Sequence, residues 1–279
     1  MGGTIYDYIM ERVGDLDFVV DYRAGRISRD EFVRRVRNAS DALEGRGLSP
    51  FQITKLGMFP ATDRGPAEAM LAGLARAGFL DDPTPDDAGY RAFARGLRGA
   101  FRHLEDRYTY IFPDEARAAW EFARVIRPSH VVVCGAYYNY LAVWVASGLA
   151  ADGTMECLDI DCGVSEHGDA NMRALGLADR VTTRCADAER ALLERAEPID
   201  LLVVDATGPT THPDPRYHGK SIYGPFLRAA LPRMPRGSWV LAHNADPDTP
   251  LLEEFYSLLS SATYRHFVGT TDDLAVFRL

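Results

Sequence analysis

The sequence has few cysteines, no excess of positive charge and no long apolar run. Its 279 residues include four cysteines, Cys134, Cys157, Cys162 and Cys185, and none forms a CxxC pair. This excludes a simple zinc knuckle. We therefore predict reduced thiols, with Cys134, Cys157 and Cys185 acting as small hydrophobic residues in buried strands. The net charge of −9 gives no general attraction to nucleic acid or to an anionic membrane.

Two further absences bear on location. The longest apolar stretch, residues 141–151, is too short to span a bilayer. Residues 1–17 carry acidic side chains and lack the apolar core of a signal peptide. We therefore expect a cytoplasmic protein that binds neither nucleic acid nor membrane.

The spacing of apolar residues divides the chain into two regions. Residues 1–127 have the periodicity of amphipathic helices, starting with a capping box at 28–31 and helical positions Phe32, Val36 and Leu43. Proline and glycine residues mark where the later helices begin and end. These later helices are predicted at residues 66–78, 87–106 and 113–127.

From residue 130 onward, short apolar runs alternate with amphipathic helices. Continuous β-branched runs of this kind are typical of a parallel sheet that is buried on both faces. The last two runs are joined by residues 269–273, a connection too short for a crossover, so the final strand should be antiparallel. We therefore predict an α/β fold with a Rossmann-like, seven-stranded, mostly parallel sheet and a terminal antiparallel hairpin. The predicted strands are 130–134, 155–160, 181–185, 199–205, 239–243, 264–268 and 274–279.

Residues suited to binding a cofactor follow the first three strands. In open α/β sheets, ligands bind at the carboxyl ends of the strands. Gly135 allows a tight turn after the first strand, and Asp159, 24 residues later, can accept hydrogen bonds from ribose hydroxyls. Asp187, after the third strand, either binds the amine of an adenine or caps the next helix. Together these residues favour a cofactor that contains adenosine.

Polar side chains also follow the fourth and fifth strands. Asp205, His243 and Asn244 should face the same crevice, where they either bind a hard cation or hydrogen-bond the substrate. Between these strands lies a polar segment, 208–219, that contains His212. A segment of this length is either a functional lid or a mobile surface loop.

Residues 113–279 resemble the class I, S-adenosylmethionine-dependent methyltransferases, specifically the catechol O-methyltransferase-like group that acts on small molecules. The similar blocks are Gly135-Ala136-Tyr137 with Tyr140, Ala142 and Val143; Ala170-Asn171; Gly176-Leu177-Ala178-Asp179-Arg180-Val181; Asp205; Leu241-Ala242-His243-Asn244; and Asp273-Leu274-Ala275-Val276. The resemblance implies S-adenosylmethionine as cofactor. The cofactor-binding residues that follow are Gly135, Ala136, Tyr137, Asp159, Ile160, Asp187, Ala188 and Asp205.

Three departures from the family pattern lie near the first strand. Val133 stands where the family has an acid that holds the methionine ammonium. Asn139 stands at the second glycine, and Leu141 stands at a serine or threonine. These replacements concern how the methionine end of the cofactor is bound, whereas Asp159 and Asp187 still favour binding of ribose and adenine.

Two further departures concern metal and proton transfer. His243 replaces the second metal-binding aspartate, and Gly208 replaces the catalytic lysine. We therefore expect either no metal or a weak site for a divalent cation such as Mg²⁺, formed by Asp205, Asn244 and His243. Histidine titrates near neutral pH, so the predicted base is His243 or His212, with Asp205 orienting the substrate or holding a cation. Alternatively, His243 only hydrogen-bonds the backbone.

Taken together, these features predict a methyltransferase that acts on a hydroxyl of a natural product or other small metabolite. Residues 113–279 form the methyltransferase domain. Residues 1–112 form a helical region that contributes dimer contacts, a lid over the substrate or a passive cap, and we expect a homodimer. The alternative is a protein of this fold that binds the cofactor without methylating, as a pseudoenzyme, a partner subunit or an enzyme of another reaction.

Overall fold

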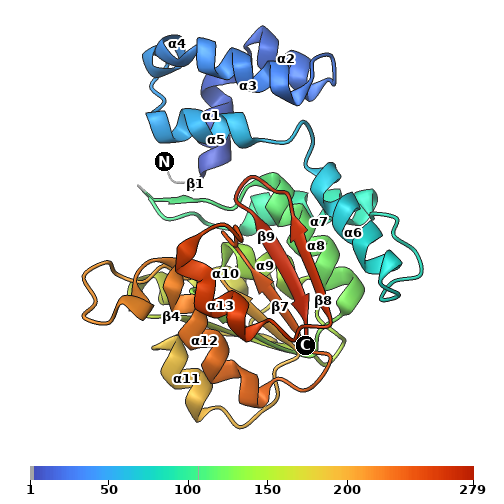
Figure 1. The fold of residues 1–279 in the computed structure, drawn as a ribbon, viewed down its shortest axis with the longest axis vertical. Helices are drawn as coiled ribbons and strands as arrows, with labels where there is room; N and C mark the ends of the chain where they lie inside the picture. Colours follow the sequence, from blue (N-terminus) through green and yellow to red (C-terminus); the bar gives the residue numbers. More distant parts are fainter. Residues whose placement is uncertain (1–2, 106) are drawn as a thin grey trace.

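The computed structural model describes residues 3–105 and 107–279. The strands of its main sheet are β3 (His130–Cys134), β4 (Thr154–Asp159), β5 (Val181–Cys185), β6 (Leu201–Val204), β7 (Trp239–Ala242), β8 (Tyr264–Val268) and β9 (Leu274–Arg278). Their order across the sheet is β5-β4-β3-β6-β7-β9-β8 (Figure 1). The first five are parallel, and β9 is antiparallel to both β7 and β8. The predicted α/β fold with a terminal hairpin is therefore confirmed.

Both faces of the sheet are apolar. The central strands are continuous apolar runs, and successive side chains of a strand point to opposite sides. Val131 and Val133 belong to the core on one face, and Val132 and Cys134 belong to the core on the other. The first face is covered by α6 (Arg64–Arg76), α7 (Asp87–Ala100), α8 (Pro113–Ile126), α9 (Tyr140–Ala146) and α10 (Cys162–Ala174). The second is covered by α11 (Ala188–Glu194), α12 (Tyr223–Ala230) and α13 (Glu253–Leu258).

Five N-terminal helices form a separate layer at one end of the molecule (Figure 1). They are α1 (Ile5–Val13), α2 (Asp17–Arg23), α3 (Arg29–Asn38), α4 (Ser40–Gly45) and α5 (Pro50–Met58). Their side chains make their own hydrophobic core, which extends from Ile5 to Phe59 and includes Phe112. Helices α6 and α7 pack into the core of the sheet, whereas Phe112 belongs to the core of the N-terminal helices, so residues 1–112 contribute to both cores.

Short elements complete the chain. A two-stranded parallel ladder joins β1 (Gly3–Thr4) to β2 (Tyr108–Thr109) and so connects the start of the N-terminal helices to the segment before α8. Among the described helices, none is both long and apolar enough to cross a bilayer. The short 3₁₀ helices are η1 (Pro215–Tyr217), η2 (Lys220–Ile222), η3 (Leu231–Arg233) and η4 (Pro250–Leu252).

Two predicted helices differ from the structure. The helix that starts after Ser28 ends at Asn38, because Ala39 leaves helical geometry with φ −94° and ψ 7°, and α4 follows it. The helix predicted over 87–106 ends at Ala100, where Phe101 becomes extended and its buried ring packs against Tyr140. Burial of an aromatic ring therefore overrides the helical propensity of this segment.

The prediction of reduced, buried cysteines is wrong for two of the four. Cys162 and Cys185 form a disulfide, whereas Cys134 and Cys157 are free and buried. Cys185 ends β5, which lies at the edge of the sheet and is largely exposed, so this strand is not buried on both faces. The disulfide links the segment after β4 to the end of β5.

Candidate active site

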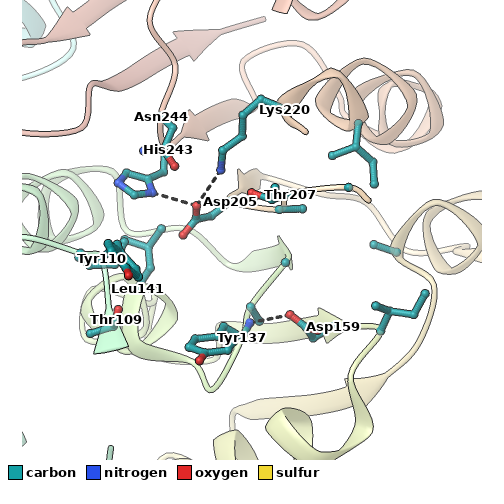
Figure 2. Close-up of a pocket in the computed structure, with 18 of the residues that line it drawn as sticks. Thr109, Tyr110, Tyr137, Leu141, Asp159, Asp205, Thr207, Lys220, His243 and Asn244 are labelled. Carbon is teal, nitrogen blue, oxygen red and sulfur yellow. Dashed lines mark hydrogen bonds and ion pairs between the residues drawn. The ribbon is translucent and has the colours of Figure 1, made fainter. Parts of the chain in front are cut away.

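A cavity of about 680 Å³ opens at the carboxyl ends of the parallel strands (Figure 2). The register of the sheet brings together side chains that follow five different strands, as expected for a fold of this type. The predicted residues that line the cavity are Gly135, Ala136, Tyr137, Asp159, Ile160, Asp187, Ala188, Asp205, His243 and Asn244. The N-terminal layer and the segment before α8 also contribute to its wall, through Phe51, Lys55 and residues 108–111.

The turn after β3 brings the backbone close to the cavity. Gly135 has φ +79°, and a Cβ atom at this position would lie 2.5 Å from the Cα atom of Ala206. Asn139 stands where a second glycine was expected and has φ +71°, a left-handed conformation that asparagine tolerates better than most residues. The side-chain Nδ2 of Asn139 donates a hydrogen bond of 2.7 Å to Oγ1 of Thr183. The departure at Asn139 therefore keeps the backbone shape of a glycine turn.

Replacement of Gly135 by alanine should destabilise the fold by roughly 2–4 kcal/mol, because it adds left-handed strain and a clash with Ala206. Gly96 in α7 is the matched control, since no atom lies within 4 Å of a Cβ built there. Gly96→Ala should leave stability unchanged or raise it slightly. Urea unfolding of both variants measures the difference. Equal stability of Gly135→Ala and the parent would contradict the tight-turn assignment.

The carboxylate of Asp159 stands at the end of β4 and faces the turn. It accepts hydrogen bonds from the backbone N–H of Tyr137 at 2.8 Å and of Asp161 at 3.0 Å (Figure 2). Each carboxylate oxygen has capacity for a second hydrogen bond. Asp159 is thus oriented by the backbone and can still accept from ribose hydroxyls.

The neighbouring acidic residues cap helices. Asp161 accepts from the N–H groups of Gly163 and Val164 at the start of α10. Asp187 accepts from the N–H of Arg190 through Oδ1 and so caps the start of α11, and it also lines the cavity. Ile160 is 76% exposed beside them, which gives the cavity an apolar surface suited to the face of an adenine ring.

At the other end of the cavity, His243 lies between two carboxylates. Its Nδ1 is 2.8 Å from Oδ1 of Asp205, and its Nε2 is 3.2 Å from Oε2 of Glu115. Burial alone lowers the pKa of an imidazole, but the charge of Asp205 and then that of Glu115 outweigh burial and raise the pKa of His243 to about 9. His243 is therefore a cation at neutral pH and does not act there as a proton acceptor.

Lys220 is a site residue that the sequence prediction did not include among the catalytic candidates. Its Nζ lies 3.4 Å from Oδ1 of Asp205 (Figure 2). The same Nζ lies 3.0 Å from the hydroxyl of Tyr223, which in turn donates to the backbone carbonyl of His243. Burial raises the pKa of a carboxyl group, but His243 and Lys220 outweigh it and lower the pKa of Asp205. Asp205 is therefore an anion that is paired with two cations.

A compositional signal in the sequence identifies the same residue. Of the 31 lysine and arginine residues, only Lys55 and Lys220 are lysines, and both line this cavity. Lysine can lose its proton under physiological conditions when its surroundings favour this, whereas arginine cannot. The rarity of lysine in the chain thus draws attention to Lys55 and Lys220 as residues of this cavity.

The polar segment 208–219 is folded on itself. Gly208 and Gly219 pair across its base with N–H to carbonyl distances of 2.9 and 3.0 Å, which brings Lys220 next to Asp205. The ring of His212 lies beside that of Tyr217, tilted by 47°, and accepts a hydrogen bond from the N–H of Asp214. His212 is not among the residues that line the cavity. The structure therefore does not bring His212 to the other candidate residues.

The candidate metal ligands do not fit a divalent cation. Asp205 already faces Lys220 and protonated His243, and the side-chain amide nitrogen of Asn244 lies 3.5 Å from the carbonyl oxygen of Asp272. Ligand atoms of Glu115, His243 and Asp272 also lie within 4.8 Å of one another. However, Asp272 already forms an ion pair with Lys55, so its carboxylate is not free to bind a metal ion.

Comparison with known proteins agrees with this geometry. Residues 132–245 match the family model described as a methyltransferase domain. Cofactor-bound Rv0187 from MTB aligns with a TM-score of 0.52 and 18% identity, over 69% of this chain and 90% of that chain. The SAH-bound methyltransferase PaMTH1 from Podospora anserina aligns with a TM-score of 0.52 and 16% identity, over 75% and 95%.

An O-methyltransferase from Bacillus cereus in complex with SAH aligns with a TM-score of 0.50 and 16% identity, over 76% of this chain and 97% of that chain. A comparison with curated protein sequences gives no match. At these identities the structural likeness shows a shared fold, the Rossmann-like sheet with an antiparallel C-terminal hairpin.

Proposed function

We propose that this chain, which carries a class I, Rossmann-like methyltransferase domain at residues 132–245, transfers the methyl group of S-adenosylmethionine to a hydroxyl of a small molecule. One observation carries the proposal: the cavity has the acceptor Asp159 at one end and the Asp205–Lys220 pair at the other. The first suits a nucleoside and the second suits proton transfer. The homodimer, the cytoplasmic location and the natural-product acceptor remain predictions.

In this proposal the cofactor lies along the ends of β3, β4 and β5. Asp159 accepts hydrogen bonds from both ribose hydroxyls, and the adenine packs between Ile160 and Ala188. The backbone of residues 135–137 lies against the methionine part. The SAH-bound relatives from Podospora anserina and Bacillus cereus support an adenosyl-sulfur cofactor for this fold.

Methyl transfer is a single displacement. A lone pair of the acceptor oxygen forms a bond to the methyl carbon while the carbon–sulfur bond breaks, and its electron pair stays on sulfur to give S-adenosylhomocysteine. The acceptor proton must leave, and Lys220, which pairs with Asp205 as an ammonium in the resting site, takes it after releasing its own proton to solvent. The resulting ammonium is stabilised by Asp205. The protein thus supplies alignment of the two reactants and one proton acceptor.

Lys220 is preferred to the histidines as base on geometric grounds. Nδ1 of His243 is held by Asp205, and its Nε2 is buried 3.2 Å from Glu115, so neither nitrogen is accessible to an acceptor in the cavity. His212 lies outside the cavity. Asp205 is held by two cations and is a weak proton acceptor. The side chain of Lys220 enters the cavity and can exchange a proton there.

The proposed function is tested by binding and by turnover. Titration calorimetry with S-adenosylhomocysteine should show one saturable site per chain. Methyl-labelled S-adenosylmethionine should then transfer its label to a hydroxyl within a panel of catechol and simple phenols. Binding without transfer to any acceptor of the panel would favour the alternative of a non-methylating protein. Absence of binding would overturn the proposed function.

Asp159→Ala should weaken the binding of S-adenosylhomocysteine by roughly 1.5–3 kcal/mol, the range for hydrogen bonds to a charged group. This corresponds to about 10–150-fold in the dissociation constant. The matched control is Asp161→Asn, which removes one carboxylate from the same segment but keeps an acceptor for the cap of α10. Calorimetry should show an unchanged affinity for this control. Equal affinities of the parent and Asp159→Ala would contradict the ribose assignment.

A further inference from the structure

Buried and partly buried groups of opposite charge form a continuous cluster at the proposed acceptor end of the cavity. Lys220 and His243 both face Asp205, and His243 also faces Glu115. The backbone N–H of Asp272 donates to Glu115 at 2.5 Å, and the Asp272 side chain pairs with Lys55. The cluster thus contains three carboxylates and three basic side chains, which balance when all are ionised. It connects β6, β7, α8, the 270–273 turn and α5.

We propose that Lys220 and His243 take the place of a divalent cation at Asp205, so that the methyl transfer of this chain needs no metal ion. This inference rests on the proposed function, because it concerns how methyl transfer proceeds at Asp205. It concerns a difference between this chain and the pattern of the resembling family, in which a second aspartate stands at position 243.

The geometry of Asp205 carries the first step of the argument. Its Oδ1 lies 2.8 Å from Nδ1 of His243 and 3.4 Å from Nζ of Lys220. A divalent cation bound to this carboxylate would lie close to both positive groups. Such an ion would have to displace at least one of them, at a cost in repulsion and desolvation.

The other potential ligands are also engaged. Glu115 is fully buried and accepts backbone N–H groups on both oxygens, from Phe112 at 2.8 Å and from Asp272. His243 is 2% exposed; its Nδ1 faces Asp205, and its Nε2 is buried 3.2 Å from Glu115 without a hydrogen-bond partner among the described residues. Mg²⁺ requires near-octahedral oxygen ligands and retains several waters. Here Asp205 is already paired with two basic side chains and Glu115 with two backbone N–H groups, so these oxygens are not free to form such a shell.

The test measures metal binding directly, without relying on turnover. Mn²⁺ is titrated into the full chain with S-adenosylhomocysteine present, and free Mn²⁺ is followed by its electron paramagnetic resonance signal. The parent protein should leave the signal unchanged, and EDTA should not alter turnover. The double variant Lys220→Met/His243→Asp should bind Mn²⁺ saturably, at least about tenfold tighter than any parent binding, because it offers Asp205, the new carboxylate and Asn244 as oxygen ligands.

Two controls separate charge from structural damage. Lys220→Arg keeps the positive charge and should still exclude Mn²⁺. Arg216→Met removes a cation from the same segment, where Arg216 pairs only with Asp214, and should also leave the signal unchanged. Circular dichroism reports folding of each variant. If the double variant does not fold, Lys220→Met alone should bind Mn²⁺ and replaces it in the comparison.

Two results would overturn the inference. The first is saturable Mn²⁺ binding by the parent that Asp205→Asn abolishes. The second is a folded Lys220→Met/His243→Asp or Lys220→Met variant that does not bind Mn²⁺. The positive charges would then not be what excludes the ion. Affinity for S-adenosylhomocysteine is measured in the same samples. If the parent protein does not bind S-adenosylhomocysteine, the proposed function is refuted. The Mn²⁺ signal, in contrast, reports on the charge cluster alone.

Discussion

Replacing Lys220 with methionine should lower the rate of methyl transfer by about 10²–10⁴-fold, the usual cost of removing a general base. Methionine has a similar length and apolar stem but cannot take a proton. The affinity for S-adenosylhomocysteine should stay within a few-fold, because Lys220 lies at the opposite end of the cavity from Asp159 (Figure 2). A loss of rate without a loss of cofactor affinity is therefore the expected signature.

Lys220→Arg distinguishes proton transfer from simple charge. Arginine keeps the pair with Asp205 but does not release its proton, so this variant should be nearly as slow as Lys220→Met. Arg216→Met, from the same segment but outside the cavity, should behave as the parent. Turnover of Lys220→Arg within a few-fold of the parent would show that Lys220 is not the base.

The free energy of unfolding of the parent should fall between about pH 6.5 and pH 9. The His243→Gln variant should lack this part of the decrease. The folded protein raises the pKa of His243 from the ordinary value of 6.5 to about 9. A group whose folded pKa is raised contributes its full stabilisation below the unfolded pKa and loses it as the pH passes the folded pKa. The expected difference is roughly 2–4 kcal/mol of unfolding free energy.

Urea unfolding at about pH 6 and about pH 10 measures this difference. The decrease between the two conditions should be larger for the parent than for His243→Gln, since glutamine does not titrate. His212→Gln is the matched control, because it removes a histidine outside the cavity and should keep the pH dependence of the parent. The same pH dependence in the parent and in His243→Gln would mean that His243 is not held as a cation.

The part of the fold from residue 130 onward was predictable because local pattern and topology agree. Buried strands alternate with helices, and residues 269–273 leave no room for a crossover. Residues that follow such strands necessarily meet at one edge of the sheet, which is why Asp159, Asp205 and His243 could be placed in one crevice. The edge position of β5 was not predictable, since strand order depends on pairing between distant segments.

The charge environment of the site could not be derived from spacing. Glu115 stands at the start of α8 and reaches His243 across 128 positions of sequence, a contact created only when α8 packs on the sheet. The sequence does not show that Glu115 and Asp205 flank position 243. A histidine there is therefore expected, from its ordinary pKa, to be a neutral base. Lys220 approaches Asp205 because the segment between them closes at Gly208 and Gly219.

The cavity is encoded by two stretches of the chain that can change separately. Every predicted cofactor residue follows a strand of the sheet, whereas Phe51 and Lys55 come from α5, a helix with its own hydrophobic core (Figure 1). Substitutions at Phe51 can therefore reshape the wall next to the acceptor while keeping the Lys55–Asp272 pair that joins α5 to the turn before β9. Varying residue 51 is a direct route to altered acceptor choice with the same methyl donor.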